Sequence, residues 1–188
     1  MVRPIVRHVP NLLSALRLLA APLAAWLIVN DHDTAALCLF AVAGVSDGLD
    51  GLVARRWGVA SDFGAWLDPA ADKFLMLLCL IALLAIGAAP LWLVALVVAR
   101  DLAIAAGWLL IKFFGLPIAT TTLFPGKAST VVQMLYIFIV LLLLAFDLDA
   151  PRLALAASWV CGAFTILSAA AYGGMALRGL FAGRHVAP

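Results

Sequence analysis

Long apolar segments dominate this chain and restrict what it can fold into. Six of them approach the roughly twenty mostly apolar residues that a helix needs to cross a bilayer. They cover residues 12–29, 34–53, 67–86, 91–114, 130–146 and 153–175, with polar or helix-breaking stretches between them. Because 66% of the 188 residues are apolar and only 12% are charged, a water-soluble domain could not bury so much apolar surface. The sequence therefore predicts an all-α integral membrane protein with six transmembrane helices. A single membrane domain is expected over residues 1–188, with a short lead-in at 1–11.

The distribution of basic residues predicts an orientation in the membrane. With six spans, both termini and the connections after the second and fourth spans lie on the same side. That side receives Arg3, Arg7, Arg17, Arg55, Arg56, Lys73, Lys112, Lys127, Arg178 and Arg184. The opposite side has Arg152 and four aspartates, Asp31, Asp33, Asp147 and Asp149. Since basic residues mark the cytoplasmic face, we expect cytoplasmic termini in a multi-pass protein of the bacterial inner (plasma) membrane. Topology accounts for the positive charge, so no nucleic-acid partner is expected.

Four aspartates stand out at the polar boundary between the second and third apolar segments. Asp47 and Asp50 are three residues apart and Asp68 and Asp72 are four apart, so each pair presents two carboxylates on one helix face. A short connection lets the two pairs face each other, where four carboxylates would repel strongly without cations. All-oxygen ligation suits Mg²⁺, Mn²⁺ or Ca²⁺ rather than zinc. A solvated loop is the simpler alternative and is expected for Asp62, but ionisable residues within spanning segments are costly and usually functional.

Two divalent cations held by carboxylates suit chemistry at a diphosphate. Such ions stabilise both the attacking and the leaving oxygen during displacement at phosphorus. Arg55 stands one turn beyond Gly51 and offers a forked donor to phosphate. A fourth carboxylate could accept the proton of an attacking hydroxyl. The residue types therefore predict transfer at a diphosphate, at the cytoplasmic side of a membrane enzyme.

The motif Asp47-x2-Asp50-Gly51-x2-Ala54-Arg55-x8-Gly64-x3-Asp68-x3-Asp72 resembles the signature of the CDP-alcohol phosphatidyltransferases at every fixed position. The segment "PNLLSALRLLAAP" also looks like the usual first helix of that family. The resemblance implies transfer of a phosphatidyl group from CDP-diacylglycerol to an alcohol, with release of CMP, by a homodimer. It assigns two Mg²⁺ or Mn²⁺ ions to Asp47, Asp50, Asp68 and Asp72, and the general-base role to Asp72. It further implies that the CDP moiety lies against Gly51, Ala54, Arg55 and Gly64.

The acceptor alcohol is harder to predict, and the candidate residues lie further along the chain. Arg100 and Asp101 fall about halfway along the fourth apolar segment, and Lys127 precedes the fifth. Arg100, helped by Lys127, could bind the phosphate of an anionic acceptor. Alternatively, Arg100 and Asp101 form a structural pair or contact the aspartates of the third segment. "ARDLAIAAGWLL" and "FPGKASTVVQML" resemble the corresponding helices of phosphatidylglycerophosphate synthases and cardiolipin synthases. Glycerol 3-phosphate or phosphatidylglycerol is therefore the expected acceptor, and an inositol phosphate stays open.

Three other functions compete with this prediction. A cation transporter would spread its carboxylates across the depth of the membrane, whereas these cluster at one face beside an arginine. An aspartate-rich prenyltransferase shares only the Asp-x3-Asp element and is usually a longer chain. An inactive scaffold is disfavoured because every motif position is filled.

Overall fold

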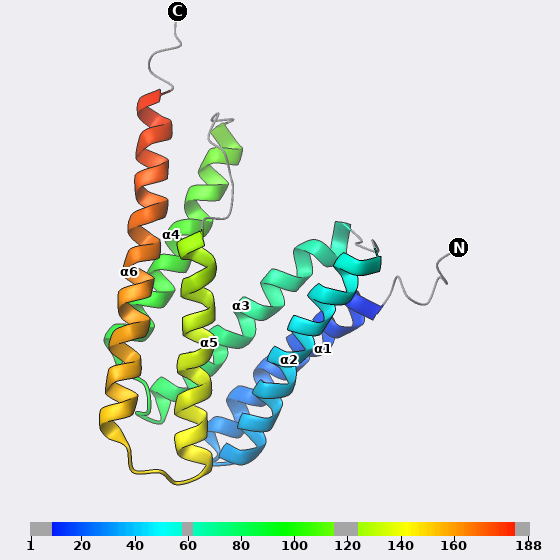
Figure 1. Cartoon of the computed structure of the whole chain (residues 1–188), viewed down its shortest axis with the longest axis vertical. Coiled ribbons are helices and arrows are strands. Elements are labelled where there is room, and N and C mark those ends of the chain that lie inside the picture. Colours follow the sequence, from blue (N-terminus) through cyan, green and yellow to red (C-terminus); the bar gives the residue numbers. More distant parts are fainter. Residues whose placement is uncertain (1–8, 58–61, 115–123, 183–188) are drawn as a thin grey trace, which may run out of the picture. The chain divides into compact units, whose positions relative to one another are not determined.

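The computed structural model describes the backbone of residues 9–57, 62–114 and 124–182, and the side chains of residues 16–46, 70–113 and 124–176. These residues form six α-helices, and the described part of the chain contains no β-strand (Figure 1). The helices are α1 (Val9–Val29), α2 (Asp33–Trp57), α3 (Asp62–Ala85), α4 (Leu91–Phe114), α5 (Phe124–Ala145) and α6 (Pro151–Ala182). The all-α prediction is confirmed, and each predicted apolar segment coincides with one helix.

The helices are longer than the predicted apolar segments at several polar ends. α2 continues to Trp57 and α3 begins at Asp62, so the aspartate-rich stretch is helical on both sides of its connection. α5 begins at Phe124, six residues before the predicted start, with Pro125 in its first turn. Proline is favoured there because the first N–H groups of a helix have no intrahelical partner. A hydropathy pattern finds the apolar part of a helix, whereas the hydrogen-bonded turns extend beyond it.

Three helices end in the same way, with a residue in the left-handed backbone conformation. The positive φ angles are 58° at Asp31 after α1, 76° at Gly87 after α3 and 49° at Asp147 after α5. The next residue then donates its backbone N–H five positions back, as in the Schellman cap. These bonds run from His32 to Leu27 (2.9 Å), from Ala88 to Leu83 (2.8 Å) and from Leu148 to Leu143 (2.9 Å). Each cap satisfies a carbonyl that the helix end would otherwise leave open.

The chain forms two compact units, which are described separately. The first comprises residues 1–89 and 137–150, and within it α1 packs against α2 and α3. α1 buries one face at helical spacing, formed by Arg17, Ala21, Ala24 and Ile28. Small residues on this face let the neighbouring backbones come close together.

The second unit comprises residues 90–136 and 151–188, and in it α4 packs against α6. Gly162 of α6 makes room for Trp92 of α4, because a Cβ atom at this glycine would lie 2.7 Å from the Trp92 ring. The Trp92 ring also packs on Trp159, with ring centroids 4.9 Å apart. These contacts hold the first turns of α4 against α6.

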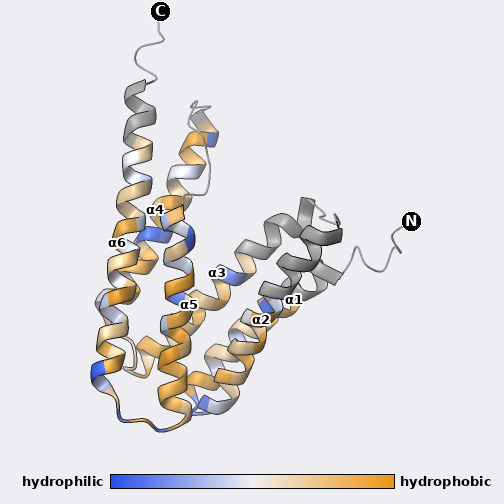
Figure 2. Cartoon of the chain, viewed as in Figure 1, coloured by the Kyte–Doolittle hydropathy of each residue, from blue (hydrophilic) through white to orange (hydrophobic). Residues whose placement is uncertain are grey.

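The helices α4, α5 and α6 carry the clearest membrane signal. Leu91–Phe113, Phe124–Ala145 and Pro151–Ala176 are long and apolar enough to cross a membrane. Figure 2 shows apolar colours along most of these helices. Two shorter apolar helical stretches, Leu16–Val29 and Asp33–Ser46, lie in the first unit among the residues whose side chains are described. The chain is therefore a helical membrane protein.

Candidate active site

The predicted metal-binding aspartates lie on two consecutive helices of the first unit. Asp47 and Asp50 are on α2, and Asp68 and Asp72 are on α3. Both segments are helical, so the spacings of three and four residues place each pair on one helix face. The helical context that the motif requires is therefore present.

Of these four carboxylates, only that of Asp72 belongs to the described side chains. Asp72 is partly buried on α3, next to the fully buried Ala71. The side chains of Asp47, Asp50 and Asp68 lie outside the described residues, as do those of Gly51, Ala54, Arg55 and Gly64. Among the side chains that are described, no group of three or more His, Cys, Asp or Glu forms a metal cluster. The donor chemistry fits Mg²⁺ or Mn²⁺, because four carboxylates offer only hard oxygen ligands. The metal centre stays a prediction.

The first unit contains a buried cation, Arg17, one of the basic residues that predict the orientation in the membrane. Arg17 lies on the buried face of α1, and only 3% of its surface is exposed. α1 packs against α3, the helix that carries Asp68 and Asp72. Buried arginines are almost always paired, so Arg17 belongs to the interior electrostatics of this unit.

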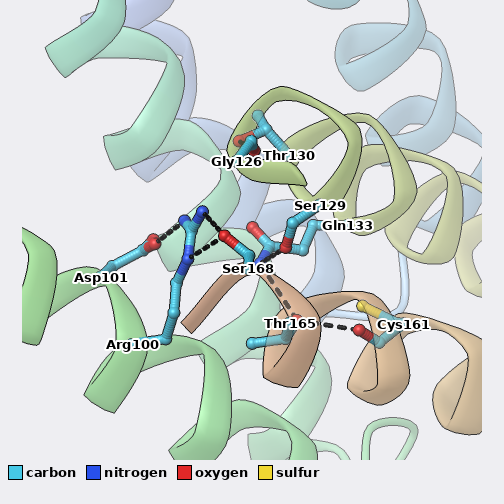
Figure 3. A network of polar contacts seen from close by, with 9 residues as sticks. All are labelled: Arg100, Asp101, Gly126, Ser129, Thr130, Gln133, Cys161, Thr165 and Ser168. Atoms are coloured by element: carbon cyan, nitrogen blue, oxygen red, sulfur yellow. Dashed lines mark hydrogen bonds and ion pairs between the residues drawn. The ribbon is translucent and has the colours of Figure 1, made fainter. Parts of the chain in front are cut away.

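The second unit contains the candidate acceptor-binding residues, and Arg100 lies at the centre of a polar network (Figure 3). Its Nη1 donates to the Asp101 carboxylate at 2.5 Å. Its Nε and Nη2 both donate to the hydroxyl oxygen of Ser168 on α6, at 3.2 and 2.5 Å. The Arg100 side chain is only 6% exposed, whereas that of Asp101 is 30% exposed. The structural pairing considered for Arg100 and Asp101 is therefore present, together with a link to α6 that the sequence did not suggest.

Tyr172 connects the surroundings of Arg100 to the beginning of α5. The Arg100 Cζ atom lies 5.9 Å from the centre of the Tyr172 ring, a cation–π distance. The hydroxyl end of that ring is so close to Gly126 that a Cβ atom at this glycine would be 2.6 Å from the tyrosine hydroxyl oxygen. Lys127 follows Gly126 directly, and its side chain is exposed. Tyr172 therefore lies close both to Arg100 of α4 and to Gly126, the residue that precedes Lys127 in α5.

A second set of polar contacts joins α5 and α6 further along the helices. Gln133 Nε2 donates to Ser129 at 3.3 Å and to Thr165 at 3.4 Å. Thr165 in turn donates to the backbone carbonyl of Cys161 at 2.8 Å. All four residues are buried, so polar groups lie inside this unit beside its apolar core. Such an arrangement is typical of membrane helices that associate through hydrogen bonds.

Sequence reasoning missed these α5 and α6 residues, although a signal for them exists. Their polar positions recur every three or four residues, which places them on one face of each helix. The α6 face contains Cys161, Thr165, Ser168 and Tyr172, and the α5 face contains Gly126, Ser129, Gln133 and Tyr136. A polar stripe along an otherwise apolar helix indicates the side that faces other helices.

Comparison with known proteins places this geometry in a family. The family model described as CDP-alcohol phosphatidyltransferase matches residues 7–167. A cardiolipin synthase (CMP-forming) of Streptomyces coelicolor is 39% identical over 144 residues, covering 73% of this chain and 66% of that protein. A protein of Mycobacterium tuberculosis H37Rv named "Probable phosphatidylglycerophosphate synthase" is 32% identical over 179 residues, covering 92% of this chain and 83% of that protein.

Some relatives are much longer than this chain. A protein of Schizosaccharomyces pombe, named as a fusion of cardiolipin synthase (CMP-forming) and a mitochondrial hydrolase, is 37% identical over 180 residues. The match covers 87% of this chain but only 30% of the fusion protein. The family match, in contrast, extends over most of this chain and contains both aspartate pairs, Arg100 and Lys127. The chain belongs to the CDP-alcohol phosphatidyltransferase family.

Proposed function

We propose that this chain transfers a phosphatidyl group from CDP-diacylglycerol to an alcohol and releases CMP, as a step of phospholipid biosynthesis. One observation carries the proposal: all eight signature residues stand at their expected spacing on α2 and α3, inside the region that matches the family. The named relatives support it, since they are cardiolipin synthases (CMP-forming) and phosphatidylglycerophosphate synthases.

The aspartates and their neighbours divide the work of the reaction. Asp47, Asp50, Asp68 and Asp72 would hold two divalent cations, Mg²⁺ or Mn²⁺, which neutralise the diphosphate of CDP-diacylglycerol. Asp72 would also accept the proton of the acceptor hydroxyl as that oxygen attacks phosphorus. Arg55 would bind the diphosphate through its forked N–H groups. The small residues Gly51, Ala54 and Gly64 would leave room for the cytidine.

The acceptor is proposed to be glycerol 3-phosphate or phosphatidylglycerol, with an inositol phosphate as the alternative. Each of these molecules carries phosphate, and the two basic residues proposed to bind it are Arg100, which lies 5.9 Å from the centre of the Tyr172 ring, and the exposed Lys127. The relatives include synthases that are named for phosphatidylglycerophosphate and for cardiolipin. Their names alone do not favour one acceptor over the other.

The membrane arrangement is part of the same proposal. All six helices cross the membrane, both termini and the active site face the cytoplasm, and the enzyme is a homodimer in the bacterial inner (plasma) membrane. The excess of basic residues on one side supports this orientation.

The deciding experiment offers labelled CDP-diacylglycerol to the purified protein with one acceptor at a time. Glycerol 3-phosphate, phosphatidylglycerol, inositol phosphate and serine are tested in parallel, and both CMP and the lipid product are identified. We expect CMP release with one of the phosphate-bearing acceptors. Removal of metal by EDTA is expected to stop the reaction, and Mg²⁺ or Mn²⁺ should restore it. A protein that releases no CMP with any acceptor, in the presence of either metal, contradicts the proposal.

Asp72→Asn tests the proposed general base. The amide cannot accept a proton, so turnover should fall by about a hundredfold or more while the helix remains intact. Asp149→Asn is the matched control, because Asp149 is an exposed aspartate in the connection between α5 and α6. Full activity in Asp72→Asn would remove Asp72 from the proposed role.

A further inference from the structure

The guanidinium of Arg100 is held from three directions by residues of the second unit. Ser168 accepts from Nε and Nη2, Asp101 accepts from Nη1, and the Tyr172 ring lies 5.9 Å from Cζ. Ser168 and Tyr172 are four residues apart on α6, so one helix face provides both contacts. Figure 3 shows the Ser168 hydroxyl between Arg100 and the α6 backbone.

The two hydrogen-bonding partners of Arg100 have different electrostatic consequences. Asp101 carries a negative charge and offsets part of the positive charge of Arg100, although its 30% exposure leaves it open to solvent screening. Ser168 is fully buried and uncharged. Its hydroxyl therefore fixes the orientation of the guanidinium without neutralising it. A carboxylate at this position would cancel the charge that an anionic acceptor requires.

The contacts also determine which N–H groups of Arg100 can bind a ligand. An arginine has five N–H groups, and Ser168 and Asp101 take three of them, with Ser168 accepting the pair from Nε and Nη2. One N–H group on each terminal nitrogen is not used in these contacts. Two N–H groups on adjacent nitrogens match two oxygens of a phosphate.

We propose that Ser168 is a positioning residue for acceptor binding. Its hydroxyl oxygen holds the Arg100 guanidinium so that the terminal nitrogens meet the phosphate of the acceptor. The ligand class is a phosphomonoester or phosphodiester that also carries the attacking hydroxyl. This inference rests on the proposed phosphatidyl transfer and deepens it, because it makes α6 part of acceptor selection.

The test compares Ser168→Ala with Ser158→Ala in steady-state assays of CMP release. Ser158 is the matched control: it is also buried on α6, but its hydroxyl donates to Leu155 O within the same helix. Loss of a hydrogen bond to a charged group is expected to raise the acceptor KM by about tenfold in Ser168→Ala. The KM for CDP-diacylglycerol and kcat should change by less than about twofold, since Ser168 is not proposed to act on either. Ser158→Ala should leave both KM values unchanged.

Two further variants keep the inference testable if Ser168→Ala fails to fold. Ser168→Cys nearly preserves the side-chain volume but offers only a weak acceptor, so a raised acceptor KM is again expected. In an Arg100→Ala background, Ser168→Cys should have no additional effect on the acceptor KM, because Ser168 acts through Arg100.

The outcomes separate this inference from the proposed function. If the wild-type protein releases no CMP with any phosphate-bearing acceptor, the proposed function itself fails. If the wild type is active and the Ser168 variants keep a normal acceptor KM, only the positioning role fails. If kcat falls and the KM values of both substrates rise by similar factors in the Ser168 variants, the hydroxyl has only a structural role, and this result would also overturn the inference.

Discussion

Gly126→Ala is a sharp test of the packing between α5 and α6. A Cβ atom at this position would lie 2.6 Å from the Tyr172 hydroxyl oxygen, 2.8 Å from Cε2 and 3.1 Å from Cζ. Atoms in favourable contact keep about 3.5–4 Å apart, so the ring edge would have to retreat by roughly 1 Å. A tyrosine ring moves as a rigid body, and this displacement also disturbs its contact with Arg100.

The expected cost follows from two opposing contributions. Forcing an extra methyl group into a packed site typically costs about 1–3 kcal/mol. Replacing glycine by alanine in a helix returns about 0.5–1 kcal/mol. The net destabilisation is therefore up to about 2.5 kcal/mol, which corresponds to a decrease in Tm of up to about 10 °C for a chain of this size.

Thermal unfolding in detergent, followed with a thiol-reactive fluorescent dye, would measure this change. Cys79 and Cys161 are buried and become accessible on unfolding, and a Cys38→Ser background removes the exposed thiol. Gly173→Ala is the matched control, because a Cβ atom there meets nothing within 4 Å. The control should keep or raise Tm. A Gly126→Ala protein that is as stable as the Gly173→Ala protein would refute the packing argument.

Three other changes test separate parts of the description. Arg100→Ala is expected to raise the acceptor KM by about tenfold or more. Arg152→Ala, at the exposed start of α6, is the control and should leave this KM unchanged. An unchanged acceptor KM in Arg100→Ala would exclude Arg100 from acceptor binding. Tyr136→Phe should maintain or raise Tm, because the buried Tyr136 hydroxyl has no hydrogen-bond partner among the described residues. A decrease in Tm of several degrees would show that the hydroxyl has a partner. A single cysteine at Ser61, in a cysteine-free background, is expected to react with a membrane-impermeant reagent only from the cytoplasmic side, and reaction from the other side would reverse the topology.

The helices could be predicted from the sequence because long apolar segments leave few alternatives in a membrane. The prediction for α4 agrees with the observed bounds at both ends, whereas α5 begins earlier and α6 ends later than predicted. Those extensions include polar or small residues such as Lys127 and Arg178, which a hydropathy pattern assigns to connections. Backbone hydrogen bonds continue through them, and composition alone does not report such bonds.

The candidate site was predictable to different degrees in its two parts. The aspartate motif has fixed spacing, so its helical placement could be inferred from the sequence and is confirmed by the bounds of α2 and α3. The surroundings of Arg100 could not be inferred in the same way, because Ser168 is 68 residues away in the chain. A contact over such a distance depends on how α4 and α6 pack, which no local pattern specifies.

The left-handed caps after α1, α3 and α5 have a consequence for biosynthesis. Each cap ends its helix within a few residues of the next one, so the connections to the following helices are only 30–32, 86–90 and 146–150. In the proposed orientation these are the segments that the insertion machinery must carry across the bilayer. Their ionisable groups are mainly aspartates and one histidine, and no lysine or arginine lies within them. Because basic residues are the ones retained on the cytoplasmic side, these turns present little resistance to translocation. The caps that complete the helix ends therefore also shorten the polar segments that must cross the membrane during insertion.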